Sequence, residues 1–410
     1  DAGPADDARR AGRFAAGLLL MWTAPARSAE ARALYDAAEA DRAARPERYV
    51  LDVEPILAAA FRKDSLGPDD DGDWREGLAV YLAAARDEGR LNALGVKSIA
   101  ATAIGRLQAR VAIARALGAA PEIRKRRIDR PIFVIGGWRT GTTLLQRLLA
   151  AVPALRGAYP SELSVPWRFA GLDQGARDAL IDAGASAHDL LHLLNPAMQA
   201  IHPSGARLAE ECVLAMGTDF RNWGFTSTLR CPSYAAWLAT QDLSGSYHRY
   251  ADILRLLDDD SGRRWILKAP AHTAEMPSLF AAFPDALVVH LHRDVVQTVT
   301  SGASLFAAFR STYSDEVDAF EVGRYQLDTT AAWFERALRA RDARPDAAMI
   351  DVAFTDLVAD PIATARAIGR ASDVTWNNEV DSALRVRLGE LHEQHGAHRY
   401  APQDFGLDPD

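Results

Sequence analysis

The chain contains little cysteine and no hydrophobic run long enough for a membrane span. Two cysteines, Cys212 and Cys231, occur among 410 residues, which argues against a disulfide framework and favours a reducing, cytoplasmic compartment. The apolar run over residues 14–21 is too short to cross a bilayer. Three arginines precede this run, as they would in a signal peptide, but acidic residues open the chain. We therefore interpret the run as part of a first amphipathic helix, with a signal peptide as the alternative.

The chain also lacks an excess of positive charge. Its formal net charge is −8, which argues against nucleic acid or another polyanion as a partner. Any anionic ligand must then be held by a local group of basic side chains. The hydrophobic content of 49% and the charged content of 25% are typical of a globular protein, and 410 residues suffice for one large domain or two.

The pattern of apolar residues changes along the chain. Residues 1–125 are rich in alanine and predict helices over 74–90 and 98–117, the second with Ser98 as its N-cap and Gly118 as its stop. From residue 131 onward short apolar segments alternate with helical patterns, and the candidate strands are residues 132–135, 265–267, 286–291 and 348–352. This alternation predicts an α/β fold, in which helices flank a parallel sheet. We expect a helical N-terminal region, residues 1–125, packed on a catalytic domain, residues 126–410.

The most informative segment is residues 131–143, which read PIFVIGGWRTGTT. It predicts a buried strand, a glycine-rich loop and the start of a helix, which together form an anion site because backbone N–H groups and the helix dipole favour negative charge there. Gly136, Gly141 and Thr143 occupy the fixed positions of a P-loop, but Thr142 stands where a P-loop NTPase has its lysine. The loop therefore has the glycines and hydroxyl groups that bind a phosphate, but it lacks the lysine of a P-loop NTPase. Arg139 is the cation that the loop contains instead. We expect a P-loop-NTPase-like sheet, with an ATP-dependent kinase or NTPase as one alternative function.

Cations follow three of the predicted strands. Arg139 follows the first, Lys268 ends the second and Arg293 follows the third. Because ligands of parallel sheets bind beyond the carboxyl ends of the strands, these cations are expected to converge. Asp294 is a suitable N-cap for the next helix, and Ser301 lies two turns further along the same face. Arg293 and Ser301 are therefore expected to bind the same anion, Arg293 through its charge and Ser301 through its hydroxyl group.

These motifs resemble the sulfotransferases that use 3′-phosphoadenosine-5′-phosphosulfate. In that family a P-R-x-G-T-T loop follows the first strand, and residues 138–143 take its place with Trp138 instead of proline. A strand that ends in arginine, with a serine eight residues later, matches Arg293 and Ser301. The short sequence motifs LKAPAH, FPDA, HRD and FTDLVADP resemble those of the bacterial branch related to tyrosylprotein sulfotransferases. The resemblance covers about residues 131–407.

The resemblance implies roles for individual residues. The 5′-phosphosulfate would be held by Arg139, Thr140, Gly141, Thr142 and Thr143. The 3′-phosphate side would be held by Arg293, Ser301 and Arg399. Lys268 would stabilise charge on the bridging oxygen as it leaves, and Arg139 would be a catalytic residue as well as a ligand of the donor. No metal is expected, because a sulfuryl group carries less charge than a phosphoryl group. Adenosine 3′,5′-bisphosphate would be the product, and a nucleotide-binding module without catalysis is a further alternative.

The acceptor hydroxyl needs a general base, and two residues are candidates. Glu162 matches the position of the catalytic glutamate in the tyrosylprotein branch, and we favour it. His272 lies close to where cytosolic sulfotransferases have their catalytic histidine. The adjacent Glu210 and Glu211 are candidates to face the acceptor, with a solvated helix face as the alternative.

The expected acceptor is a small, rather apolar molecule or lipid. Seven aromatic residues crowd into residues 220–250, where they line an acceptor pocket or form plain core. Trp138 is a candidate to stack on the donor or the acceptor. Sugar or peptide-tyrosine sulfation is the alternative. His188 and His192 have the i, i+4 spacing of zinc ligands, but the glutamate and third ligand of such a motif are missing.

Overall fold

A computed structural model describes residues 22–67, 70–394 and 400–409, without the side chains of residues 186–188 and 392–394. The predicted first helix at residues 14–21 and the expected cofactor ligand Arg399 lie outside the described residues. In the described part of the chain, no helix combines the length and the apolar character that a membrane span requires.

Five parallel strands form one sheet in the order β2-β3-β1-β4-β5. The strands are β1 (Ile132–Gly136), β2 (Leu155–Arg156), β3 (Arg264–Lys268), β4 (Leu287–His292) and β5 (Met349–Ala353). The four predicted strands are confirmed to within one residue at each end. The two-residue β2 was not predicted, because so short a segment carries no periodic signal.

The central strand β1 pairs with β3 on one side and with β4 on the other. Phe133 lies level with Leu267 and Val288, so the three strands end at the same edge of the sheet. Both faces of β1 are buried, and all five of its residues are shielded from solvent. A strand covered on both faces reads as an unbroken apolar run, which explains why residues 132–135 show no alternation.

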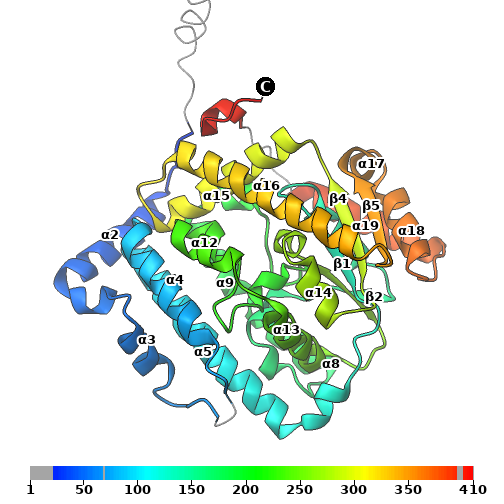
Figure 1. Ribbon diagram of the computed structural model, residues 1–410, viewed down its shortest axis with the longest axis horizontal. Helices are drawn as coiled ribbons and strands as arrows, with labels where there is room; N and C mark the ends of the chain where they lie inside the picture. The colour runs from blue at the N-terminus through cyan, green and yellow to red at the C-terminus, as the bar shows by residue number, and fades with distance from the viewer. Residues whose placement is uncertain (1–21, 68–69, 395–399, 410) are drawn as a thin grey trace, which may run out of the picture.

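Helices cover the sheet on both faces (Figure 1). The N-terminal region contains α2 (Ala29–Ala44), α3 (Val53–Ala60), α4 (Trp74–Glu88) and α5 (Ala93–Ala119). Between β1 and β3 lie α6 (Thr142–Leu149), α7 (Pro160–Ser164), α8 (Gln174–Ala183), α9 (Ala185–Leu194), α10 (Met198–Ile201), α11 (Phe225–Thr228), α12 (Pro232–Ala239) and α13 (Ser244–Leu257). The remainder are α14 (Met276–Ala282), α15 (Val295–Tyr313), α16 (Ala319–Ala343), α17 (Phe354–Ala359), α18 (Pro361–Ala371) and α19 (Asn378–Gln394).

Short 3₁₀ turns connect several of these elements. They are η1 (Pro46–Tyr49), η2 (Pro121–Lys125), η3 (Pro166–Arg168), η4 (Cys212–Leu214), η5 (Pro270–Thr273) and η6 (Pro402–Phe405).

The predicted ends of the long N-terminal helix α5 are wrong. Ser98 lies inside the helix, because Asn92 caps it earlier by accepting a hydrogen bond from the Gly95 N–H at 2.8 Å. Gly118 does not stop the helix, which continues to Ala119. One glycine in a helix costs only about 1 kcal/mol, and packing elsewhere along α5 outweighs that cost.

The N-terminal helices share a hydrophobic core with one face of the sheet. Leu78 on α4 and Leu107 on α5 belong to the same buried cluster as Phe133 and Leu267. A second cluster, which includes Val134 and residues of α6, α18 and α19, covers the opposite face. The boundary predicted at residue 125 therefore crosses a continuous core.

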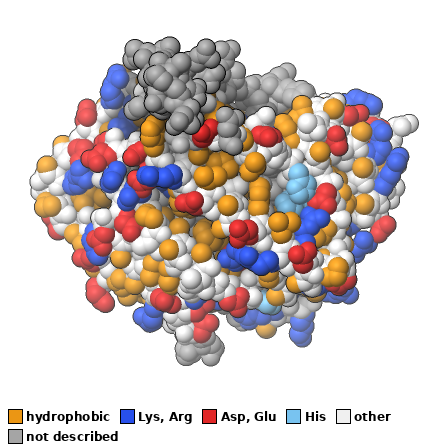
Figure 2. Space-filling view, turned by 45° about the horizontal axis from the view of Figure 1, so that its top comes forward, with side chains coloured by type: hydrophobic (Ala, Val, Ile, Leu, Met, Phe, Trp, Pro, Cys, Tyr) orange, Lys and Arg blue, Asp and Glu red, His pale blue; other side chains and the backbone are white. Residues whose placement is uncertain are grey.

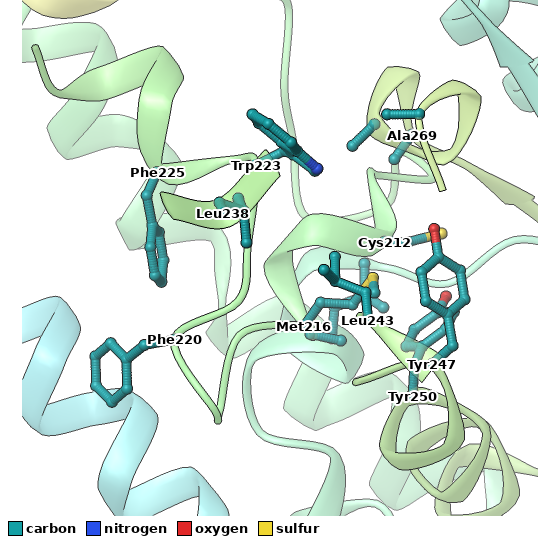
Figure 3. Packing of buried hydrophobic residues seen from close by; sticks show 14 of the residues in the cluster. Cys212, Met216, Phe220, Trp223, Phe225, Leu238, Leu243, Tyr247, Tyr250 and Ala269 are labelled. Atoms are coloured by element: carbon teal, nitrogen blue, oxygen red, sulfur yellow. The ribbon is translucent and has the colours of Figure 1, made fainter. Parts of the chain in front are cut away.

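Most of the aromatic residues between 220 and 250 belong to this core. Figure 3 shows Tyr247 and Tyr250 beside Cys212, with Phe220 and Phe225 on the other side of the cluster. The ring of Tyr81 on α4 lies 4.5 Å from the ring of Phe225. Core packing thus accounts for most of this aromatic crowding.

Candidate active site

The loop after β1 has backbone conformations that glycine alone adopts without strain. Gly136 has φ +147° and Gly141 has φ +91°. A Cβ at Gly136 would lie 2.6 Å from the Leu291 carbonyl oxygen, and one at Gly141 would lie 2.6 Å from the Leu357 side chain. The loop is therefore clamped between β4 and α17, and α6 begins directly after Gly141.

Arg139 lies at the tip of this loop in a left-handed conformation, with φ +58°. Such a conformation is uncommon for a residue with a side chain and occurs often at functional sites. Its Nη1 donates to the Ile201 carbonyl oxygen at 2.7 Å, at the end of α10. Burial lowers the pKa of Arg139, and the positive charge of Arg293 acts in the same direction. The negative charge of a bound anion would oppose both effects and raise the pKa of Arg139 again.

The threonines of the loop have different environments. Thr140 is buried, and its hydroxyl donates to the Gly137 carbonyl oxygen at 2.9 Å, which closes the loop on itself. Thr142 and Thr143 are the first two residues of α6, where free N–H groups point out of the helix. Thr143 Oγ1 accepts a hydrogen bond from Lys268 at 3.0 Å. The cation that the loop sequence lacks is thus supplied by the end of β3.

Lys268 links the loop to an acidic residue. Its side chain is fully buried, and Nζ also donates to Glu211 Oε1 at 2.6 Å. An ammonium group has three donors, so these two contacts leave one N–H for a further ligand. The sequence placed Lys268 at the strand edge but did not indicate which carboxylate would balance its charge.

The predicted pair for the second phosphate also lies beside the loop. Arg293 Nη1 donates to the Arg139 carbonyl oxygen at 2.8 Å, and its guanidinium carbon lies 4.4 Å from the centre of the Phe354 ring. Asp294 caps α15 as predicted, by accepting from the Gln297 N–H at 2.9 Å. Ser301 is 2% exposed, and its hydroxyl has no hydrogen-bond partner in the described structure. Its neighbour Gly302 packs against Trp138 of the loop, so this turn of α15 faces the loop.

Glu162, the favoured base, lies in a different cluster. One carboxylate oxygen accepts from Arg156 at 2.7 Å and from Arg177 at 3.0 Å, and the other accepts from the Tyr159 N–H at 3.0 Å. Glu162 lines none of five cavities in the described part of the chain, including the one that Glu211 lines. Both of its oxygens therefore accept hydrogen bonds from other residues of the chain, and its catalytic role stays a prediction.

His272, the second candidate base, is buried beneath the site. Its Nδ1 lies 2.6 Å from the Tyr247 hydroxyl, while its Nε2 is buried without a hydrogen-bond partner in the described structure. Burial lowers the pKa of His272 to about 3, with a smaller contribution from the charge of Lys268. The imidazole is therefore neutral at pH 7, but the adjoining Pro270 and Ala271, not His272, reach the cavity wall.

A cavity of about 330 Å³ lies between α5, α9 and α15 and is lined by Glu211, the partner of Lys268. Its apolar wall includes Ile99, Trp138, Leu191, Leu305, Phe306 and Phe309. Trp138 packs against Phe306 and Trp333, with ring centroids 4.8 and 5.2 Å apart. Trp223 and Phe225 are the members of the aromatic segment that also line it. The N-terminal helices α4 and α5 thus form part of the cavity wall.

One end of the cavity is polar. Glu210, Glu211, His202 and Ser204 line it, and Ser204 Oγ lies 3.4 Å from His192 Nε2. The sequence indicated Glu210 and Glu211 only as a candidate acceptor-facing pair. It gave no signal for His202, which becomes part of the site only because α10 ends there. On the face shown in Figure 2, acidic and basic side chains are interspersed.

Together these features define a class of protein. A parallel sheet, an anion-binding loop after its central strand, and cations at three strand ends form a P-loop-like, nucleotide-binding α/β architecture.

Residues 131–378 match the sequence profile of the sulfotransferase family, and the chain belongs to this family. The crystal structure of sulfotransferase STF1 from Mycobacterium tuberculosis H37Rv superposes with a TM-score of 0.76 at 32% identity, covering 88% of this chain and 96% of that one. Sulfotransferase STF9 from Mycobacterium avium has the same fold, with a TM-score of 0.75 at 23% identity over 88% of this chain and 93% of that one.

A curated relative is the omega-hydroxy-beta-dihydromenaquinone-9 sulfotransferase Stf3 of Mycobacterium bovis, 24% identical over 242 residues. The match spans 57% of this chain and 60% of that protein.

Proposed function

We propose that this protein transfers a sulfuryl group from 3′-phosphoadenosine-5′-phosphosulfate to the hydroxyl of a small, largely apolar acceptor. The observation that carries the proposal is the position of Lys268. Its ammonium group bonds Thr143 in the anion loop and Glu211 at the cavity, so one cation lies between a donor site and an acceptor site.

The residues present fit the donor. When bound, it supplies an activated sulfuryl group attached to a phosphate leaving group. Arg139, Thr142 and Thr143 hold the 5′ end with the backbone N–H groups at the start of α6. Arg293 and Ser301 hold the 3′-phosphate, which gives the buried Ser301 hydroxyl its missing partner. Lys268 neutralises the charge that develops on the leaving oxygen, a role that requires no divalent metal.

The cavity supports an apolar acceptor with one hydroxyl. Aromatic and aliphatic side chains form most of its wall, and that wall includes Glu211, the hydrogen-bond partner of Lys268. The name of the curated relative, a menaquinone-derived lipid sulfotransferase, agrees with this chemistry. A sugar would leave many hydroxyl groups against apolar walls, so sugar sulfation is disfavoured.

Calorimetric titration with adenosine 3′,5′-bisphosphate, and separately with ATP and Mg²⁺, tests the donor assignment. We expect the bisphosphate to bind in preference to ATP, and Arg293→Ala to weaken it about 10- to 100-fold, as loss of a charge-assisted hydrogen bond does. Arg127→Ala is the matched control, since Arg127 is 81% exposed and pairs only with Asp129 among its described ion pairs. A preference for ATP, or equal binding by the two variants, would contradict the proposal.

A further inference from the structure

The polar end of the cavity holds three groups that can exchange protons. One side-chain atom each of His202, Glu210 and Glu211 lies within 4.8 Å of the other two. The group adjoins Lys268, which touches both the anion loop and Glu211. All three side chains line the cavity, and Glu211 connects it to Lys268.

The two adjacent glutamates differ in how many partners hold them. Glu210 lies 3.6 Å from Arg147 and 3.6 Å from His202, and it accepts from the Glu211 N–H at 2.9 Å. Burial opposes ionisation of Glu210, but the hydrogen bond from His202 and the charges of Lys268 and Arg147 outweigh it and lower its pKa. Glu210 thus serves as a fixed negative charge that orients its neighbours.

Glu211 is positioned for chemistry instead. Its side chain is 19% exposed, against 6% for Glu210, and it lines the cavity. Lys268 contacts Oε1. A carboxylate can accept several hydrogen bonds, and the bond from Lys268 occupies one of these positions. Glu211 can therefore also accept a hydrogen bond from a hydroxyl group in the cavity. Because the same ammonium group contacts the loop, Lys268 holds this carboxylate in a fixed relation to the donor site.

We propose that Glu211 is the general base of the transfer, an assignment that rests on the proposed function. The acceptor O–H proton passes to the Glu211 carboxylate while the acceptor oxygen forms a bond to sulfur. The bond between sulfur and the bridging oxygen breaks, and its electron pair stays on the 5′-phosphate of adenosine 3′,5′-bisphosphate. Lys268 stabilises that oxygen, and no other reactant is needed.

Two acceptors of different acidity test the assignment, because an alcohol needs a base and an ionised phenol does not. The probes are 1-octanol and 4-nitrophenol, each with the sulfated donor, at a pH where the phenol is ionised. We expect Glu211→Gln to lower turnover of the alcohol about 10²- to 10⁴-fold, the usual contribution of a general base, and that of the phenol less than tenfold. Glu335→Gln is the control, since Glu335 is 68% exposed on α16.

Binding provides a readout that does not depend on turnover. Glu211→Gln removes a negative charge beside Lys268, so its affinity for adenosine 3′,5′-bisphosphate should be unchanged or higher. Equal losses with both acceptors, or weaker bisphosphate binding, would overturn the assignment and make Glu211 a clamp for Lys268. Loss of the alcohol reaction in His202→Gln but not in Glu211→Gln would assign the base to His202. A wild-type protein that binds no bisphosphate would instead contradict the proposed function.

Discussion

Two acidic clusters in this molecule look alike in composition and differ in what they can do. In the first, which we call the Glu162 cluster, Glu162 pairs with Arg156 and Arg177, and both arginines also donate to the Leu257 carbonyl oxygen. In the second, the Glu211 cluster, Glu211 pairs with Lys268 beside Glu210 and His202. The shortest ion-pair distances are nearly equal, 2.7 Å and 2.6 Å.

The difference lies in the partners of each cation and in access to the cavity. In the Glu162 cluster every named cation is tied to backbone carbonyls, and the carboxylate caps the start of α7. In the Glu211 cluster the cation touches the anion loop, and the carboxylate lines a cavity. A short ion pair therefore does not by itself identify a catalytic carboxylate, and our proposal for Glu211 rests instead on the shared cation and on access to the cavity.

The largest effect that would sharpen this comparison is expected at Lys268. Lys268→Met keeps the buried stem and removes the charge, so turnover should fall about 10²- to 10³-fold, as for other donors to a developing anion. Thermal unfolding should change little, because Glu211 remains partly exposed to water. Steady-state kinetics and a melting curve check this, with the exposed Lys125→Met as control. Retained turnover in Lys268→Met would place the active site elsewhere.

The Glu162 cluster should show the reverse pattern. Glu162→Gln leaves two buried arginines without their carboxylate, and breaking a buried ion pair costs about 3 kcal/mol or more of unfolding free energy. Turnover per folded molecule should stay within about twofold of wild type, since Glu162 does not line the cavity that Glu211 lines. Chemical denaturation followed by an activity assay measures both. A stable variant with little turnover would restore Glu162 as the catalytic base.

A smaller effect is expected from His272, and it depends on pH. Its folded pKa of about 3 lies below the unfolded value of 6.5, so the unfolded chain binds the proton more readily between these values. His272 therefore contributes stability that is present above pH 6.5 and is lost as the pH falls toward 3. Replacing it by asparagine should remove this part of the acid sensitivity, measured as urea denaturation at pH 7.5 and pH 5. Parallel losses of stability in both proteins would contradict the neutral, buried imidazole.

Much of the donor side could be predicted from the sequence, because its determinants are local. The strand, the glycines and the following helix are adjacent in the chain, and the strand-end positions of Lys268 and Arg293 follow from the parallel sheet. Trp138 was recognised as unusual, but its packing between Phe306 and Trp333 joins the loop to α15 and α16 and has no local signal.

The sequence by itself determined the α/β class, the anion loop and the family, since these depend on patterns within a few residues of each other. The tertiary structure decided which carboxylate meets the lysine. Glu162 follows the loop closely in the chain, but its carboxylate pairs with Arg156 and Arg177 and does not line the cavity that Glu211 lines. Glu211 reaches Lys268 only because the long segment between β1 and β3 folds back over the strand edge. Such contacts arise from packing between distant segments, which the spacing of residues along the chain does not encode.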